Sequence, residues 1–150
     1  MLLDNNLKLS DEQAVTSTAV SENTLDLSQS RDIAPGRPLY GVFTVTESAA
    51  AAGAATVTFE IISSAAADLS SPTVLSSSGP IGKADLAASR TPIAVPLAPH
   101  VLASLDTGQR YLGFRFTVAT GPLTAGKFTS YLNDSYPSGQ KTYPGGYTVA

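Results

Sequence analysis

Residues 111–118, Tyr-Leu-Gly-Phe-Arg-Phe-Thr-Val, alternate along most of their length between apolar and polar or small side chains. Successive side chains of a β-strand point to opposite faces, so this pattern predicts a strand with one buried face. Leu112, Phe114, Phe116 and Val118 are expected to face inward, and Arg115 and Thr117 outward.

The same period of two recurs upstream and downstream of this stretch. Residues 39–46, 56–61 and 128–132 are predicted strands, and residues 73–76 and 93–97 are weaker candidates with prolines at or beside their ends. Thr56, Thr58 and Glu60 are expected on an outward face. The predicted core comprises Phe43, Val45, Val57, Phe59, Ile61, Leu112, Phe114 and Phe116. Several short strands separated by Gly/Pro turns predict an all-β fold, an antiparallel jelly-roll-like sandwich.

The connections are expected to be loops, with two short helical turns. Residues 48–55, 63–71 and 76–80 are rich in Ser, Ala and Gly and are predicted loops. Ser10 is a candidate helix cap with Gln13 at the third position, which predicts at most one turn of helix over residues 10–14. A second turn is expected over residues 100–105, after Pro99.

The two ends of the chain differ in character from its middle. Residues 1–31 are predicted to form an extended N-terminal arm, residues 32–134 the β core, and residues 135–150 a C-terminal tail. The tail contains two copies of a Tyr-Pro-[Ser/Gly]-Gly motif, at Tyr136 and Tyr143, and Tyr147 follows them. Proline restricts the residue before it to extended backbone, which favours an extended tail.

Composition excludes several classes of protein. The 150 residues contain no Cys and one His, which excludes disulfide frameworks, thiol nucleophiles and sites built on several histidines. Nine scattered basic residues and a net charge of −3 give no electrostatic footprint for nucleic acid. No stretch approaches 18 apolar residues, so no membrane span is expected.

Two weak catalytic motifs are set aside, and no enzyme activity, cofactor or metal is expected. Residues 121–127, Gly-Pro-Leu-Thr-Ala-Gly-Lys, resemble a phosphate-binding loop, but Phe128 stands where Ser or Thr is needed and a strand, not a helix, is predicted to follow. A hairpin turn explains the glycines equally well. His100 has Asp85 and Asp106 as candidate partners, but no Gly-x-Ser-x-Gly elbow is present.

Binding to other protein is the remaining class. Charged residues are only 14% of the chain, against about 25% in an average domain, whereas it has 21 Ala, 18 Ser and 16 Thr. Such a surface is easily desolvated, which predicts a homo-oligomer, with a dimer favoured over a trimer. The tail tyrosines either cap the protein's own sheet or dock onto a neighbouring chain, since Tyr supplies large contact area at low entropic cost.

The N-terminal sequence resembles the capsid cement (decoration) proteins of tailed bacteriophages. Three segments in order carry the resemblance: an opening Leu-Asp step with Ser-Asp-Glu-Gln-Ala-Val-Thr at residues 10–16, Asn-Thr-Leu-Asp-Leu at 23–27, and Arg-Asp-Ile-Ala-Pro-Gly-Arg-Pro-Leu at 31–39. The chain departs from the family pattern at Ala34, where Gly is expected. The match covers about the first 40 residues.

The resemblance implies a jelly roll on the exterior of a virion, made in the host cytoplasm, that binds the outside of the capsid shell and cements neighbouring subunits of the major capsid protein. The ends of the chain are expected to make these contacts, through Leu3, Leu7, Leu9, Gln13, Leu25, Leu27, Tyr136, Tyr143 and Tyr147. A receptor- or carbohydrate-binding β domain on a virion or cell surface is the alternative, since exposed aromatic residues suit either function.

Overall fold

The computed structural model describes residues 4–28, 37–98 and 109–135. Nine strands and two single turns of 3-10 helix lie in these ranges, and the described residues contain no α-helix. In chain order the elements are η1 (Asn5–Leu7), β1 (Lys8–Ala14), β2 (Ala19–Val20), β3 (Leu25–Asp26), β4 (Leu39–Ala50), β5 (Thr56–Ser64), β6 (Thr73–Gly82), η2 (Lys83–Asp85), β7 (Ile93–Leu97), β8 (Tyr111–Ala119) and β9 (Ala125–Asn133).

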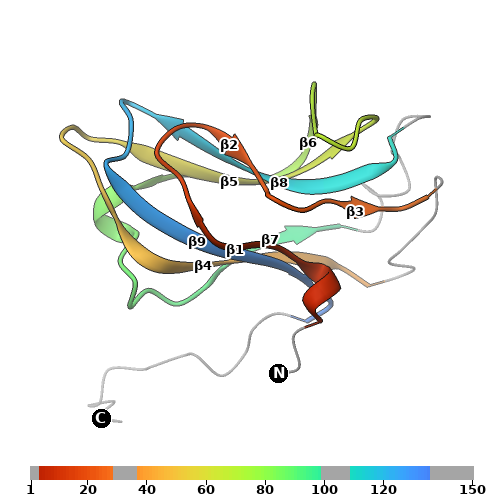
Figure 1. Cartoon of the computed structure of the whole chain (residues 1–150). Helices are drawn as coiled ribbons and strands as arrows, with labels where there is room; N and C mark the ends of the chain where they lie inside the picture. Colours follow the sequence, from red (N-terminus) through yellow and green to blue (C-terminus); the bar gives the residue numbers. More distant parts are fainter. Residues whose placement is uncertain (1–3, 29–36, 99–108, 136–150) are drawn as a thin grey trace, which may run out of the picture.

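The strands form two antiparallel sheets that pack face to face as a sandwich (Figure 1). One sheet has four strands in the order β1-β9-β4-β7. The other has five: β2, β8, β5 and β6 follow one another, and β3 also pairs with β8. The predicted all-β, jelly-roll-like sandwich is confirmed, and the strands expected at residues 73–76 and 93–97 are both present.

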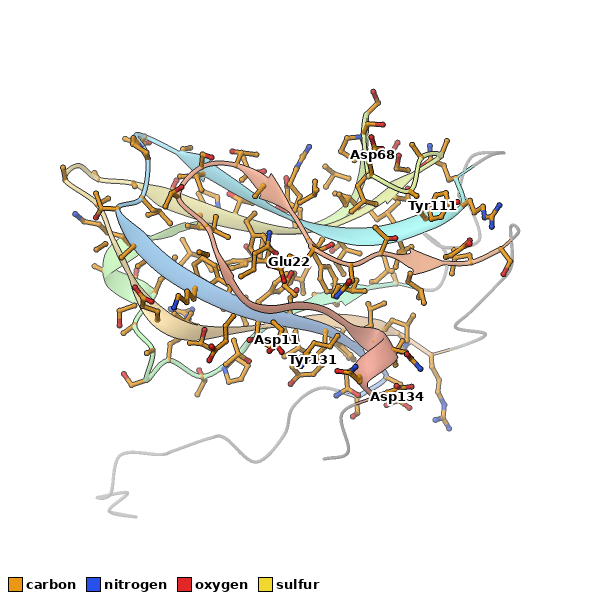
Figure 2. All side chains as sticks on the ribbon, viewed as in Figure 1. Asp11, Glu22, Asp68, Tyr111, Tyr131 and Asp134 are labelled. Atoms are coloured by element: carbon orange, nitrogen blue, oxygen red, sulfur yellow. The ribbon has the colours of Figure 1, made fainter. Side chains whose placement is uncertain are left out.

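Five phenylalanines from both sheets form the centre of the core. Phe43, Phe59, Phe114, Phe116 and Phe128 are fully buried, and the ring centroids of contacting pairs lie 4.8–6.0 Å apart. Side chains fill the space between the sheets (Figure 2). All eight residues of the predicted core are buried, so the expected register of β4, β5 and β8 is confirmed.

The N-terminal segment is part of the sandwich, so the prediction of an extended arm over residues 1–31 is wrong for the described residues 4–28. β1 pairs with β9, whereas β2 and β3 pair with β8 in the opposite sheet. Leu9, Val15 and Leu27 belong to the hydrophobic core. The segment therefore crosses from one sheet to the other and closes one side of the sandwich, as the red strands of Figure 1 show.

Two local predictions are also wrong, for related reasons. Residues 10–14 form a strand, not a helical turn, because their backbone pairs with β9; the Ser10 hydroxyl donates to Oε1 of Gln13 at 2.7 Å. Residues 76–80 form part of β6, because pairing with β5 orders this serine-rich stretch. Pro80 is tolerated there because β6 lies at the edge of its sheet. The turn expected over residues 100–105 lies outside the described residues.

Candidate functional site

The structure places most of the predicted N-terminal contact residues within the protein's own packing. Leu9 and Leu27 are buried in the core, which corrects their assignment as partner-binding residues. Leu7 and Leu25 are partly buried and pack against the same core. Leu3, Tyr136, Tyr143 and Tyr147 lie outside the described residues.

Gln13 has a structural role on the closed side of the sandwich. Its amide accepts from the Ser10 hydroxyl and donates to the carbonyl of Val20 at 2.8 Å, so one side chain joins β1 to β2. The backbone N–H of Asn23 adds a bond to the carbonyl of Leu9 at 2.9 Å. The Gln13 bond joins strands of different sheets, and the Asn23 bond holds the connection between β2 and β3 against β1.

The outer face of the five-stranded sheet presents side chains of β5, β6 and β8 in register. Thr58 lies opposite Thr117 on β8 and Pro80 on β6. In the next row Glu60 lies opposite Arg115 and Ser77. We call the side chains of these two rows the β5–β8 face. Their outward orientation follows from the inward orientation of Val57, Phe59 and Ile61, which alternate with them along β5.

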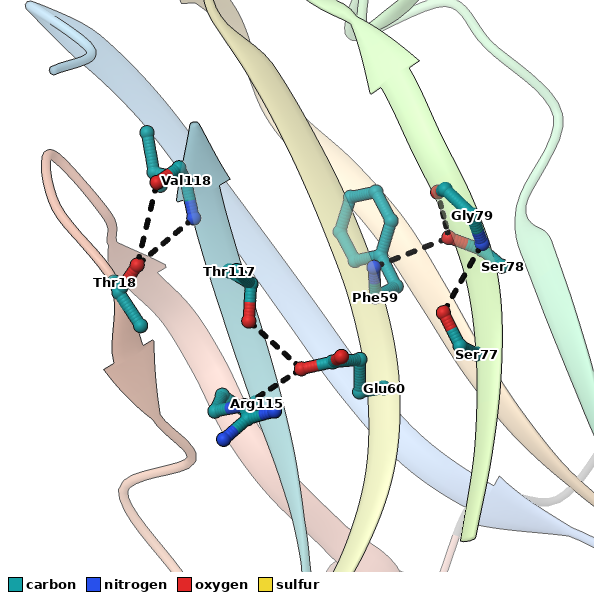
Figure 3. Close-up of polar contacts among 9 residues, drawn as sticks. All are labelled: Thr18, Phe59, Glu60, Ser77, Ser78, Gly79, Arg115, Thr117 and Val118. Carbon is teal, nitrogen blue, oxygen red and sulfur yellow. Dashed lines mark hydrogen bonds and ion pairs between the residues drawn. The ribbon is translucent and has the colours of Figure 1, made fainter. Parts of the chain in front are cut away.

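An ion pair lies at the centre of the β5–β8 face. The Nε of Arg115 donates to Oε2 of Glu60 at 2.6 Å, and the Thr117 hydroxyl donates to the same oxygen at 2.7 Å (Figure 3). The side chains are 25% exposed for Arg115 and 11% exposed for Glu60. Burial by itself would raise the pKa of Glu60, but the hydrogen bonds from Arg115 and Thr117 and the Arg115 charge hold that pKa below its usual value.

Sequence reasoning placed Glu60, Arg115 and Thr117 on outward faces but did not pair them. Each strand does carry a local signal of a charged outward position: Glu60 follows Thr56 and Thr58, and Arg115 precedes Thr117. It becomes a prediction only when β5 and β8 are known to be neighbours in the sheet, and 46 residues separate the end of β5 from the start of β8.

Polar groups at both edges of this face are satisfied within the chain. The Thr18 hydroxyl accepts from the N–H of Val118 at 3.0 Å, beside β2 (Figure 3). At the β6 edge, the N–H of Phe59 donates to the Ser78 hydroxyl at 3.1 Å, and Ser78 in turn donates to the carbonyl of Gly79. Gly79 has a φ of +72°, a backbone conformation that glycine adopts without strain and that shapes the irregularity in β6.

One end of the sheet is apolar and covered by a loop. Ile62 and Leu69 are buried although they lie on the outer side of the sheet, away from the central core. Leu69, in the connection between β5 and β6, packs directly on Gly113: a Cβ at Gly113 would lie 2.2 Å from Leu69 Cδ1. Val74, opposite Ile62, is 42% exposed and extends this apolar end to the β6 edge.

The chemistry of the β5–β8 face suits contact with a protein surface. Its one ion pair is internally neutral, and threonine, serine and proline side chains surround it. Desolvating such a surface costs less than desolvating isolated charges. In residues 4–28, 37–98 and 109–135, no group of three or more His, Asp or Glu side chains is placed to hold a metal ion.

Two further observations concern motifs set aside in the sequence. Residues 121–124 belong to the connection from β8 in the five-stranded sheet to β9 in the four-stranded sheet, and residues 125–127 begin β9. Gly121 has a φ of +101°, and Lys127 lies 3.3 Å from a carboxylate oxygen of Glu47. The hairpin interpretation of these glycines is therefore wrong, because β8 and β9 do not pair, but the predicted strand after Lys127 is present. No helix among the described residues is long and apolar enough to cross a membrane. His100 lies outside the described residues.

Comparison with known proteins places the chain in a family. A search of curated proteins found no significant match. A protein-family model named Bbp16 matches residues 9–132, which is more than half of the chain and includes every strand except the ends of β1 and β9. The chain therefore belongs to the Bbp16 family.

Proposed function

We propose that this protein is a structural virion component that binds the outside of a phage capsid shell and cements neighbouring subunits of the major capsid protein. The observation that carries the proposal is the β5–β8 face, in which threonine, serine and proline side chains surround one internally neutral ion pair. The resemblance of residues 10–16, 23–27 and 31–39 to cement proteins supplies the class of partner.

The size of the sheet fits this role. The whole outer side of the five-stranded sheet, four strand widths of about 4.8 Å by nine residues at about 3.3 Å each, measures on the order of 600 Å², and the β5–β8 face is its centre. A stable protein interface takes about 800 Å² from each partner, so the proposed contact extends from the β5–β8 face over the rest of this side and its rim. Self-association, with a dimer favoured, would add a second contact.

The proposed mechanism is mass action on the assembled shell. A protein that binds the intact shell and not its separated subunits stabilises the shell by about RT ln(1 + [L]/Kd) per site. Repetition over many equivalent sites turns a modest affinity per copy into a large total stabilisation. No catalytic step or cofactor is part of this proposal.

Binding to purified shells tests the proposal. Shells that lack the protein should bind it saturably and should disrupt at a higher temperature once it is bound. Thr58→Lys adds a positive charge in the centre of the β5–β8 face and should raise the Kd for shells roughly tenfold or more. A tenfold change in Kd corresponds to about 1.4 kcal/mol of binding free energy. Thr46→Lys adds the same charge at an exposed position on the other sheet and should bind as the wild type does.

Two outcomes would contradict the proposal. If the protein binds glycans and does not bind shells, it is a carbohydrate-binding domain. If Thr58→Lys and Thr46→Lys bind shells equally well, the β5–β8 face is not the contact.

A further inference from the structure

The Glu60–Arg115 ion pair is only partly used within the chain. Oε2 of Glu60 accepts two bonds, one from Nε of Arg115 at 2.6 Å and one from the Thr117 hydroxyl at 2.7 Å. In Figure 3 both dashed lines meet at this one oxygen. Among the described residues, no group donates to Oε1 of Glu60, and no acceptor takes the N–H groups on the two Nη atoms of Arg115.

A second arginine–carboxylate pair in the same chain shows the closed alternative. Arg110 donates from Nε to Oδ1 of Asp26 and from Nη2 to Oδ2, each at 2.6 Å, so both carboxylate oxygens are bonded. Planar guanidinium and carboxylate groups favour this two-bond geometry. In the other pair the Thr117 hydroxyl shares the oxygen that Arg115 uses. The Glu60–Arg115 pair therefore keeps an acceptor oxygen and a fork of N–H donors available.

The available atoms lie on the outer side of the sheet. Phe59 and Ile61 face the core and Glu60 alternates with them, while Arg115 lies opposite Glu60 on β8. Neither side chain of the pair is among the described residues with buried polar atoms that lack a hydrogen-bond partner, so water reaches the available atoms in the free protein. A partner that covers this face removes that water and must replace its hydrogen bonds.

The available atoms disfavour a charged partner group. A carboxylate would accept from Arg115 but would lie against Glu60, which is ionised at neutral pH because its hydrogen bonds outweigh the effect of burial and lower its pKa. An ammonium or guanidinium group would meet the like charge of Arg115. A carboxamide is neutral, and its carbonyl oxygen accepts while its NH2 group donates. It therefore matches both halves of the pair.

A side chain fits the site better than the backbone of a partner. Peptide groups carry the same donor and acceptor, but those of a folded partner are already paired in its own structure. The pair is also recessed, since the Glu60 side chain is only 11% exposed. Small side chains flank it, with Val20 and Ser77 in the same row and Thr58 in the next. The tip of a side chain can reach such a position.

We propose that the Glu60–Arg115 pair binds the carboxamide of an asparagine or glutamine side chain on the partner protein. The carbonyl oxygen accepts from the Nη groups of Arg115, and the NH2 group donates to Oε1 of Glu60. The inference rests on the proposed function, because that proposal makes the β5–β8 face the contact.

A titration of the free protein tests the chemistry without a shell. Acetamide is the smallest carboxamide probe, and acetate is its charged counterpart of similar size. Acetamide should shift the Nε–H resonance of Arg115 roughly threefold further than that of Arg110, whose pair is closed, and acetate at equal ionic strength should shift Arg115 less than acetamide does. A larger shift of Arg115 with acetate, or equal shifts of both arginines with acetamide, would overturn the inference.

A conservative substitution tests the same contact on shells. Arg115→Lys keeps a positive charge beside Glu60 but removes the planar fork, so it should raise the Kd for shells roughly tenfold. Arg90→Lys is the matched control at an exposed arginine outside the face, where Nη1 donates to the carbonyl of Asp85, and its Kd should equal that of the wild type. Unfolding in urea checks that both variants are folded.

The outcomes separate this inference from the proposed function. If the wild type binds shells and Arg115→Lys binds them equally well, the carboxamide contact is wrong and the proposed function stands. If the wild type does not bind shells, the proposed function is wrong, and the acetamide titration alone then supports or overturns the carboxamide site. If Arg115→Lys loses a dimer seen in sedimentation but keeps its affinity for shells, the occupant is a second copy of the chain and the inference is wrong.

Discussion

Removing either member of the Glu60–Arg115 pair should destabilise the protein, but by different amounts, because the two side chains differ in burial. The Glu60 side chain is 11% exposed and the Arg115 side chain 25% exposed. Replacing Arg115 by Met leaves a nearly buried carboxylate with only Thr117 as a donor, whereas replacing Glu60 by Gln leaves a guanidinium that still reaches water. Arg115→Met should therefore destabilise the protein more than Glu60→Gln.

The expected magnitudes follow from the contacts. A hydrogen bond to a charged group contributes about 1.5–3 kcal/mol, and removing one member of a fully buried pair costs about 3–5 kcal/mol. The Glu60–Arg115 pair is intermediate in burial, so we expect about 1–2 kcal/mol for Glu60→Gln and about 2–4 kcal/mol for Arg115→Met. The double variant should lose less than the sum of the two, because its second substitution removes a charge that the first left unpaired.

Equilibrium unfolding in urea, followed by far-UV circular dichroism, measures these differences. Glu47→Gln is the matched control: Glu47 pairs with Lys127 at 3.3 Å, but both side chains are nearly half exposed, so the loss should stay within about 0.5 kcal/mol. The lowered pKa of Glu60 means that its carboxylate stabilises the fold above its usual pKa and that this contribution falls as pH drops through the lowered value. The difference between wild type and Glu60→Gln should therefore shrink in acid. If Glu60→Gln costs no more than Glu47→Gln at neutral pH, our account of the pair is wrong.

Four further measurements address the core, the edge and the assembly state. Phe114→Ala should cost about 3–5 kcal/mol in the same assay, and a loss below about 1 kcal/mol would contradict the packing of the aromatic core. The hydrogen bond from Arg110, with a second from the N–H of Ser28, lowers the pKa of Asp26 to about 2. Asp26→Asn should therefore be less stable than wild type above pH 4, and in acid titrations the two unfolding free energies should converge as pH falls towards 2. Gly113→Ala should destabilise the protein by about 1–3 kcal/mol because the new methyl group meets Leu69, and Leu69→Ala in the same chain should recover part of the loss. Sedimentation at tens of micromolar should show a dimer, and a species of about 15 kDa alone would contradict the predicted self-association.

The central strands were predictable because their signal is local. In β5 and β8, apolar and polar residues alternate without interruption around Phe59 and Phe116, and period two by itself specifies which side chains face inward. Nothing distant along the chain is needed to see this. The orders β1-β9-β4-β7 and β2-β8-β5-β6 are properties of tertiary pairing, so neither they nor the Glu60–Arg115 pair could be deduced from spacing.

The outward but buried residues show a second limit. Alternation along β4 and β5 places Val42 and Ile62 on outer faces, which ordinarily predicts exposure. Ile62 is buried because the connection that carries Leu69 folds back over the sheet, and Leu69 does so at a φ of +57°, which its own side-chain type disfavours. A single sequence does not reveal which connection covers which face.

The N-terminal segment was missed because bulges break its alternation. Leu9 and Ser10 are adjacent and both buried, the pairing of β1 shifts register twice, and Glu12 has a φ of +49°. β2 and β3 have only two residues each, too few to show a period. Their partner strand, β8, begins more than 80 residues later, so the segment has no recognisable pattern until the sandwich exists.

The position of this segment also changes what the family resemblance can mean. Its motif at residues 10–16 includes Ser10 and Gln13, which join β1 to β2, and its motif at residues 23–27 includes Asn23 and the buried Leu27. Residues that close a protein's own sandwich are similar between relatives because the fold requires them, whatever partner each relative binds. The resemblance at these positions therefore supports membership of the same class of protein, from which the proposed partner is taken, but it does not identify the residues that contact that partner. Under the proposed function, the contact surface should instead be sought where side chains face outward, which makes the β5–β8 face the first place to introduce a charge.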